Sequence, residues 1–327
     1  MNRFDIVVSN YKKLDCFVDN FPRIQNFDGQ RDRVYIFDCS PDQDWQEQLA
    51  VADRLTFWGL RWGHNLYFIR RRNWGDNWGA QLDYFRCIQD QKISKPQYAA
   101  FMQEHYLDLG RYVKEDTIPE DAAYDLDQIE TRFQFDTAIG CVFFSRYGIR
   151  VRATNPVLDR KKEFFGDGEE LLPGARRRGF CVDGGNFVVR PQLYLNWFDS
   201  HPYYLTQGDG SYPFCIVWEA RMGQILYDQE IKWADMYRNL EFSTIEQLDE
   251  IEVSRAEKVS MLWYDNRVWF FFYGRDLESY PPKPLISVLR YYLRHYLRRL
   301  VLHSRMTRLA FVQPSGLESI LSDEVKI

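Results

Sequence analysis

The sequence lacks several patterns that would fix its class at once. Its six cysteines are scattered and form no C-x-x-C pair, which argues against a structural zinc site and against a disulfide framework. No apolar run approaches the 18 residues that a membrane-spanning helix needs. The net charge of −5 gives the whole chain no nucleic-acid signature. These absences indicate a globular protein with free thiols and no nucleic-acid partner.

Two further signals are missing. The start, MNRFDIVVSNYKK, leads directly into a strand-like run and lacks the long apolar region of a signal peptide, so we expect a cytosolic protein. Neither G-x-G-x-x-G nor G-x-x-x-x-G-K-[ST] occurs, which disfavours a dinucleotide fold and a P-loop ATPase.

Aromatic residues, by contrast, are abundant and make up 17% of the chain. Trp and Tyr combine an apolar face with a polar edge, which suits sugar stacking as well as core packing. A hydrophobic share of 45% and a charged share of 27% are those of an ordinary soluble protein. A chain of 327 residues can form one large domain or two.

Strand-like and helix-like runs alternate over the first hundred residues. We expect strands at 4–10, 33–40, 65–70 and 98–102, and helices at 14–24, 44–55 and 80–88. This alternation predicts a parallel sheet with right-handed crossovers. Ligands of such sheets bind at the carboxyl ends of the strands. The polar residues that follow these strands are therefore candidates for a site: Asn10, Tyr11, Asp38, Ser40, Asn73, Gly75, Gln103, Glu104 and His105.

The segment NWGDNWG, residues 73–79, is the most informative stretch of the chain. Its two glycines allow backbone amides to approach a ligand that a Cβ would block. The helix expected just beyond it adds unpaired N–H groups and a partial positive charge. The segment predicts a cradle for the phosphates of a nucleotide sugar, with a plain Gly-rich turn as the alternative. Trp74 and Trp78 are interpreted as packing residues.

The pattern changes after residue 110. We expect an acidic loop or linker at 115–130, strands at 137–145 and 149–154, a polar loop at 160–179, a turn and strand at 181–190, helices at 193–200 and 212–223, and a hairpin of 259–265 with 267–274. The predicted organisation is a nucleotide-sugar-binding half (1–110), an acceptor-binding and catalytic half (111–275) and a basic helical C-terminal extension (276–327).

The order of motifs over residues 4–108 resembles the nucleotide-binding half of GT-A-fold, family-two-like glycosyltransferases. VVSNYKKLD matches the short polar motif after their first strand, FDCSPD fits their D-x-S-x-D pattern, and NWGDNWG resembles their N-x-G turn. The resemblance implies an α/β protein: a GT-A-like single large domain with a mostly parallel central sheet flanked by helices, plus a C-terminal helical extension.

The same resemblance implies roles for the residues in these motifs. Asp38, with Ser40 in its motif, would accept a hydrogen bond from the nucleobase, and Tyr11 would stack on the base or flank it. The alternative for Asp38 is a cap on the following turn or helix. Near the ribose and diphosphate would lie Asn73, Gly75 and Gly79.

The family's fourth strand normally ends in D-x-D, whose carboxylates hold Mg²⁺ or Mn²⁺ against the diphosphate. Here Gln103, Glu104 and His105 stand in its place. One interpretation is that His105 ligates a divalent ion, preferably Mn²⁺, with Glu104 or Asp108 assisting. Another is that His105 is a buried, hydrogen-bonded side chain. A third is a metal-independent enzyme in which a cation carries the phosphate charge, the candidates being Arg71 and Arg72.

The second half carries a weaker match. CVDGGNFVVR resembles the small-residue turn on the family's acceptor side, and QGDGSYPFCIVWEARMG resembles its G-E-D segment, with GDG in place of G-E-D. An inverting transferase needs a carboxylate that takes the proton of the acceptor hydroxyl. Asp209 is the candidate base, and Glu219 is the second candidate. Asp183 would bind a sugar hydroxyl.

The tail is rich in arginine and has no acidic residue between Ser279 and Leu317. Its apolar and basic residues recur at helical spacing, which predicts a basic amphipathic helix. Such a helix could contact the inner face of a membrane through residues 285–310. The alternative is a helix packed on the domain.

The resulting hypothesis is a cytoplasmic glycosyltransferase of polysaccharide biosynthesis. It would move a sugar, with inversion, from a nucleotide-sugar donor to a saccharide or lipid-linked saccharide acceptor. One alternative is a sugar-phosphate nucleotidyltransferase, although VVSNYKKLD lacks that class's Gly-rich loop. The other is a non-catalytic saccharide-binding protein on the same fold, which the missing D-x-D leaves open.

Overall fold

The computed structural model describes a large part of the chain. The described residues are 2–71, 76–104, 107, 123–143, 149–152, 179–182, 187–200, 232–235, 240–242, 259–264, 268–273, 310–312, 314 and 320–321. All structural statements below concern these residues.

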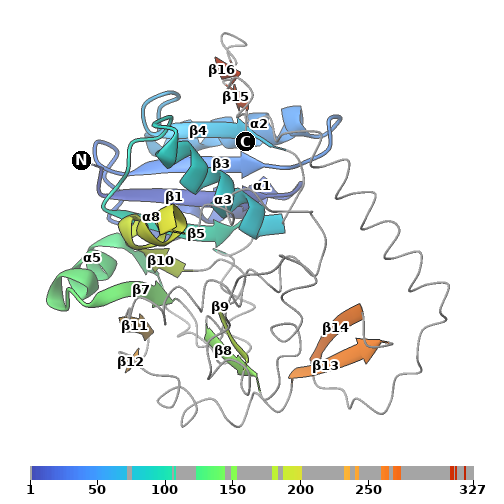
Figure 1. The fold of residues 1–327 in the computed structure, drawn as a ribbon. Coiled ribbons are helices and arrows are strands. Elements are labelled where there is room, and N and C mark those ends of the chain that lie inside the picture. Colours follow the sequence, from blue (N-terminus) through green and yellow to red (C-terminus); the bar gives the residue numbers. More distant parts are fainter. Residues whose placement is uncertain are drawn as a thin grey trace.

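Four parallel strands form the centre of the sheet (Figure 1). β1 (Phe4–Asn10) lies between β3 (Arg33–Asp38) and β5 (Tyr98–Gln103), and β4 (Leu66–Arg70) lies outside β3. Every residue of β1 is buried, because both faces of the sheet are covered. This architecture confirms the α/β class and the parallel central strands that the sequence predicts.

Strands from the second half extend the same sheet. β10 (Phe187–Val189) pairs antiparallel with both β5 and β7 (Ile139–Phe143). β11 (Lys232–Asp235) continues parallel to β7, and β12 (Leu240–Phe242) is antiparallel to β11. Residues 4–103 and 139–242 therefore contribute to one ten-stranded, mixed sheet.

Helices cover both faces of this sheet. α3 (Asp76–Gln89) and α8 (Pro191–Ser200) lie on the face turned to the viewer in Figure 1, where Phe85 stacks on Tyr194. On the opposite face lie α1 (Leu14–Asn20), α2 (Trp45–Asp53) and α5 (Leu126–Phe135). Short elements complete the described part: η1 (Phe21–Arg23), β2 (Ile24–Gln25), η2 (Arg54–Trp58), β6 (Tyr124–Asp125), β8 (Ile149–Arg152), β9 (Gly179–Val182), β13 (Val259–Tyr264) and β14 (Val268–Tyr273).

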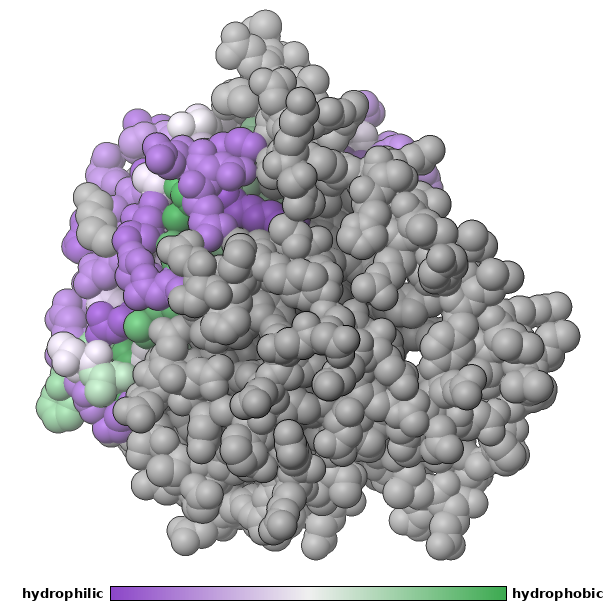
Figure 2. All heavy atoms as spheres, in the orientation of Figure 1, coloured by the Kyte–Doolittle hydropathy of each residue, from purple (hydrophilic) through white to green (hydrophobic). Residues whose placement is uncertain are grey.

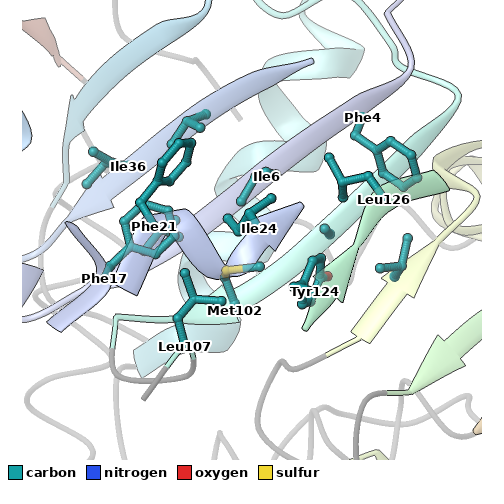
Figure 3. Close-up of a cluster of buried hydrophobic side chains, with 14 of the residues drawn as sticks. Phe4, Ile6, Phe17, Phe21, Ile24, Ile36, Met102, Leu107, Tyr124 and Leu126 are labelled. Atoms are coloured by element: carbon teal, nitrogen blue, oxygen red, sulfur yellow. The ribbon is translucent and has the colours of Figure 1, made fainter. Parts of the chain in front are cut away.

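The core on the α1, α2 and α5 face is built from alternate strand residues. Phe4, Ile6 and Val8 of β1 point to this face, because successive side chains of a strand alternate. Figure 3 shows Phe4 and Ile6 in this core together with side chains of the helices, including Phe17 and Leu126. The Phe4 ring lies 5.0 Å from that of Tyr98, so the aromatic surplus of the sequence serves packing here.

A buried arginine fastens the amino-terminal edge of the sheet. Arg3 Nη2 donates to Asp32 Oδ2 at 2.6 Å, its Nε donates to Asp32 Oδ1 at 3.0 Å, and its Nη1 donates to Asp127 Oδ1 at 2.5 Å. Arg3 and Asp32 are 4% and 1% exposed. The hydrogen bonds that Arg3 donates to Asp32 raise the pKa of Arg3 above its ordinary value. β1, the 26–32 loop and α5 are thereby joined.

The prediction of a loop or linker at 115–130 is wrong for its last part, where α5 begins. Asp125 caps this helix, because its Oδ1 accepts from the N–H groups of Asp127 and Gln128 at 2.9 and 3.2 Å. Leu126, Ile129 and Phe133 then bury one face of the helix at three- and four-residue spacing. The acidic residues around this stripe had obscured it.

Several other predictions meet the structure directly. The hairpin of β13 and β14 is confirmed as an antiparallel pair. In the described part of the chain, Cys16, Cys39, Cys87 and Cys141 form no disulfide. Of the expected loop at 160–179, only Gly179 is described, and it begins β9. The expected helix at 212–223 and residues 285–309 of the basic tail lie outside the described residues.

The C-terminal extension is not helical throughout. Ala310–Val312 form strand β15, and Ile320–Leu321 form β16. β15 pairs antiparallel with both β4 and β16, so these two strands extend the described sheet beyond β4, with β16 outermost. A three-residue strand set by long-range pairing leaves no periodic signal in the sequence.

Hydrophilic residues cover most of the described surface on the side drawn in Figure 2. Large exposed apolar side chains are few in the described part: Phe57, Trp58, Phe135 and Tyr11. Within the described ranges no helix is long and apolar enough to cross a membrane.

Candidate functional site

The ends of the four parallel strands lie in register at one edge of the sheet. Asn10 of β1 is paired with Asp38 of β3, and Asp38 is paired with Arg70 of β4. Gln103, at the end of β5, is opposite Ser9. The strand ends predicted to converge are therefore adjacent, at the edge where open α/β sheets bind ligands (Figure 1).

Asp38 is the centre of this edge and is completely buried. Its Oδ1 accepts from Asn10 Nδ2 at 2.8 Å and from Ser40 Oγ at 2.6 Å. Its Oδ2 accepts from Arg70 Nη1 at 2.7 Å. The Ser40 N–H also donates to Oδ1, at 3.3 Å, so Asp38 holds the turn that follows β3. Both carboxylate oxygens thus organise the loops around them, as the capping interpretation predicts.

Ser40 and Gln48 tie the loop after β1 to the loop after β3. The Lys12 N–H donates to Ser40 Oγ at 2.9 Å, and Lys12 has a left-handed backbone with φ of 67°. Gln48 Oε1 accepts from Asn10 Nδ2 at 3.2 Å and from the N–H of Leu14 at 3.0 Å. These bonds fix the backbone of residues 10–14 against α2.

Tyr11 lies at the surface, in the loop that follows β1. Its side chain is 44% exposed, and Lys12 Nζ lies 5.8 Å from the centre of its ring. Lys12 Nζ is 2.6 Å from Asp44 Oδ2. An exposed aromatic face beside the strand ends has the geometry that stacking on a base requires.

Arg70 is the functional candidate that sequence reasoning missed. Besides Asp38, its Nη1 donates to the Ser40 carbonyl at 2.7 Å, and its Nη2 donates to Asp42 Oδ1 at 3.0 Å. Its guanidinium lies 5.4 Å from the centre of the Trp45 ring. The signals available in the sequence were a cation at the end of the third expected strand and two carboxylates, Asp38 and Asp42, at the end of the second.

Arg71, proposed above as a phosphate-binding cation, faces the other side of the sheet. Its Nε donates to Asp83 Oδ2 at 2.8 Å, and both side chains are buried. Arg86 Nη1 donates to the other oxygen of Asp83 at 3.2 Å. Arg71 therefore anchors α3 to β4, and Arg72 lies outside the described residues.

The Gly-rich segment is arranged differently from the prediction. α3 begins at Asp76, so Gly79 is a buried residue of the first helical turn and not part of a turn that precedes the helix. Asp and Asn favour helix starts, which explains why the helix begins before the apolar run at 80–88. The first four N–H groups of a helix lack partners within the helix itself. Asn73 and Gly75 lie outside the described residues.

Gln103 and Glu104 stand where the family has D-x-D. Gln103 ends β5, and the Glu104 N–H donates to the Ser9 carbonyl at 3.1 Å. Both side chains are half-buried, while His105 and Asp108 lie outside the described residues. Among the described residues, no group of three or more His, Cys, Asp or Glu could hold a metal ion. Gln103 and Glu104 offer one amide and one carboxylate, so a cation site at this position would also need His105 or Asp108.

The candidate catalytic residues are not described. Asp183, Asp209 and Glu219 all lie outside the described residues, so their placement relative to Asp38 is not tested.

A buried carboxyl lies beneath α3, on the face of β1 opposite the main core. Asp5 is completely buried, and its Oδ2 accepts from Tyr84 Oη at 2.8 Å. Burial raises the pKa of Asp5 to about 8, against the opposing hydrogen bond from Tyr84 and the charge of Arg33. Asp5 is therefore mostly protonated at neutral pH.

No protein-family model and no curated protein matches the sequence. Similar solved structures include S. aureus TarS (10% identity, TM-score 0.38, 77% of this chain and 38% of that chain) and S. aureus TarS 1-349 (11%, 0.32, 68% and 56%). Another is glucosyl-3-phosphoglycerate synthase from Mycobacterium tuberculosis in complex with uridine-diphosphate (10%, 0.30, 84% and 88%). The chain spans 38% and 56% of the two TarS chains, and at these identities the similarity concerns fold alone.

Proposed function

We propose that the protein is a glycosyltransferase that uses a nucleotide-sugar donor, bound at the carboxyl edge of β1, β3, β4 and β5. The observation that carries this proposal is the in-register row Asn10, Asp38 and Arg70 beside the exposed Tyr11. The row lies where open α/β sheets bind ligands. Its motifs follow the order that resembles family-two-like glycosyltransferases.

Each part of this edge has a role in donor binding. Tyr11 offers a face for the nucleobase, and the loop held by Asp38 and Ser40 offers backbone groups for its edge. The amino terminus of α3, with Gly79 in its first turn, supplies N–H groups and a positive dipole end for the diphosphate. Gln103 and Glu104 border this space from β5.

Transfer requires groups outside the described residues. In the proposed reaction Asp209 takes the proton of an acceptor hydroxyl as that oxygen attacks the anomeric carbon. The bond from that carbon to the nucleoside diphosphate breaks, and the configuration inverts. Glu219 is the second candidate base, and Asp183 would bind a sugar hydroxyl. In one form of this proposal, His105 and Glu104 would hold a divalent cation beside the diphosphate.

The acceptor in this proposal is a saccharide or a lipid-linked saccharide of polysaccharide biosynthesis. The basic segment 285–310 would bring the protein to the inner face of a membrane that carries such an acceptor. Liposome flotation with anionic vesicles tests this contact. Flotation that persists after three arginines of the segment (Arg290, Arg294 and Arg298) are replaced by Gln would argue against it.

Calorimetry with UDP, GDP, ADP, CDP and dTDP, each with and without Mn²⁺, tests the donor site. We expect one nucleotide to bind and Tyr11→Ala to weaken its binding about tenfold, the order of one base–aromatic stack. If none binds, the transferase proposal fails. Binding of equal strength without Mn²⁺ would remove His105 as a ligand.

Turnover separates the enzyme from its alternatives. Asp209→Asn should abolish sugar transfer and donor hydrolysis while nucleotide affinity stays at the wild-type value. Retained turnover would move the base to Glu219. Nucleotide binding by the wild type without transfer or hydrolysis would favour a non-catalytic saccharide-binding protein.

A further inference from the structure

The C-terminal segment returns to the sheet directly beside the candidate site. Strand β15 lies antiparallel to β4, with Ala310 opposite Arg70, Phe311 opposite Ile69 and Val312 opposite Phe68. The side chain of Val312 packs against the main core. Ala310, which lies opposite Arg70, is thus remote from it in the sequence.

This pairing determines the environment of β4. β3 satisfies the backbone of β4 on one side, and β15 satisfies it on the other. Without β15, β4 would be an edge strand with unpaired N–H and C=O groups along that side. An edge strand opens more readily than a strand paired on both sides. Arg70 is the last residue of β4, where such fraying begins.

The side chain of Arg70 needs a fixed backbone. It makes hydrogen bonds at 2.7, 2.7 and 3.0 Å to Asp38, the Ser40 carbonyl and Asp42. A planar guanidinium can satisfy three acceptors at once only within a narrow range of positions. A shift at the end of β4 would therefore release residues 38–42, which form the loop of the proposed donor site.

We propose that β15 is a positioning strap: by pairing with β4 it holds Arg70 in place, and through Arg70 it holds the 38–42 loop. The donor site is complete only when the C-terminal strand is docked. The effect on nucleotide affinity rests on the proposed function, whereas the effect on the 38–42 loop does not.

Hydrogen exchange on the full chain, followed by mass spectrometry, tests the strap. The variant Phe311→Gly with Val312→Gly weakens β15, because glycine disfavours a strand and removes the Val312 contact. Its matched control is Leu240→Gly with Phe242→Gly in β12, which is also three residues long and lies at the opposite edge of the sheet. We expect about tenfold faster exchange in 66–70 and 38–42 for the β15 variant alone.

Nucleotide binding and rescue complete the test. The β15 variant should bind the nucleotide of the wild type about tenfold more weakly, while Phe311→Leu with Val312→Ile keeps wild-type exchange and affinity. Exchange in α5 should not change, which separates a local effect from general destabilisation. If the glycine pair prevents folding, Val312→Ala provides a milder variant with the same readouts.

Faster exchange in 66–70 with no change in 38–42 would overturn the proposal, because β15 would then only cover an edge. Failure of the two proposals can be told apart. A wild type that binds no nucleotide defeats the proposed function, while exchange at 38–42 still decides whether β15 positions Arg70.

Discussion

Arg70 Nη1 lies 2.7 Å from Asp38 Oδ2 and joins the ends of two neighbouring parallel strands. Asp38 is completely buried, whereas the Arg70 side chain keeps 16% exposure. Taking a carboxylate out of water is costly unless it is paired and hydrogen-bonded. The pair therefore allows a charged group to lie inside the edge where the donor is proposed to bind.

Arg70→Gln should destabilise the protein by about 3 kcal/mol, because it leaves the charge of Asp38 buried without its cation. Urea unfolding at neutral pH measures this. Arg54→Gln is the matched control: Arg54 pairs with Asp19 on the surface, where a pair contributes about 0.5 kcal/mol or less. Equal losses in the two variants would contradict the role assigned to Arg70.

Asp5 should make stability depend on pH. Burial raises its pKa from 3.8 to about 8, so the folded state retains a proton that the unfolded state has released. The stabilisation from this proton is fully present below about pH 4 and is lost as the pH rises toward 8. The slope between these values is about −1.4 kcal/mol per pH unit.

Asp5→Asn should remove this contribution, since an amide does not titrate. The measurement is the unfolding free energy of both proteins from pH 5 to 9, compared as a difference. As the pH rises, the wild type should lose unfolding free energy relative to the variant, and this relative loss should level off above about pH 8. A constant difference across the range would show that Asp5 titrates normally.

The buried pair of Arg3 and Asp32, at the amino-terminal ends of the strands, predicts a large loss of stability from a single substitution. Asp32→Ala removes the main partner of Arg3 and leaves a buried guanidinium with fewer acceptors. We expect a cost of about 3–5 kcal/mol in urea unfolding. Asp127→Ala should cost less, because that carboxylate is 59% exposed. A larger loss at Asp127 would reverse this ranking.

The end of α3 offers a stabilising substitution. Gln91 has φ of 59°, its N–H donates to the Ile88 carbonyl, and the Lys92 N–H donates to the Cys87 carbonyl. This is a Schellman motif, in which the left-handed residue is usually glycine. Gln91→Gly should raise stability by up to about 1 kcal/mol in thermal unfolding. Gln91→Ala keeps the strained backbone and should give no gain.

The parallel half of the fold could be predicted from the sequence because its strands are buried on both faces. Such strands appear as short, continuous apolar runs, as in FDIVVSN and RVYIFD. Asp38 and Ser40 come at the end of one of these runs, so the sequence correctly predicts that they lie at the carboxyl ends of the strands. Topology alone then brought them together, since parallel strands end at the same side.

The remaining features depend on information that no local pattern carries. Arg70 follows an apolar run like many surface arginines, and only the register of β3 and β4 shows its pairing with Asp38. The apolar run predicts a helix start at residue 80, four residues later than the observed start at Asp76, and so leaves Gly79 outside the helix. Helix boundaries depend on capping and not on apolar periodicity. β15 is decided by a partner strand that is remote in sequence.

The separation between β15 and β4 has a consequence for biosynthesis. Arg70 and Ala310 are 240 positions apart (310 minus 70), so a ribosome must add 240 residues after Arg70 before this pair can close. Until then β4 offers an open row of backbone donors and acceptors, which is a template for pairing between molecules. Docking of β15 therefore closes an edge through which nascent molecules could otherwise pair and aggregate.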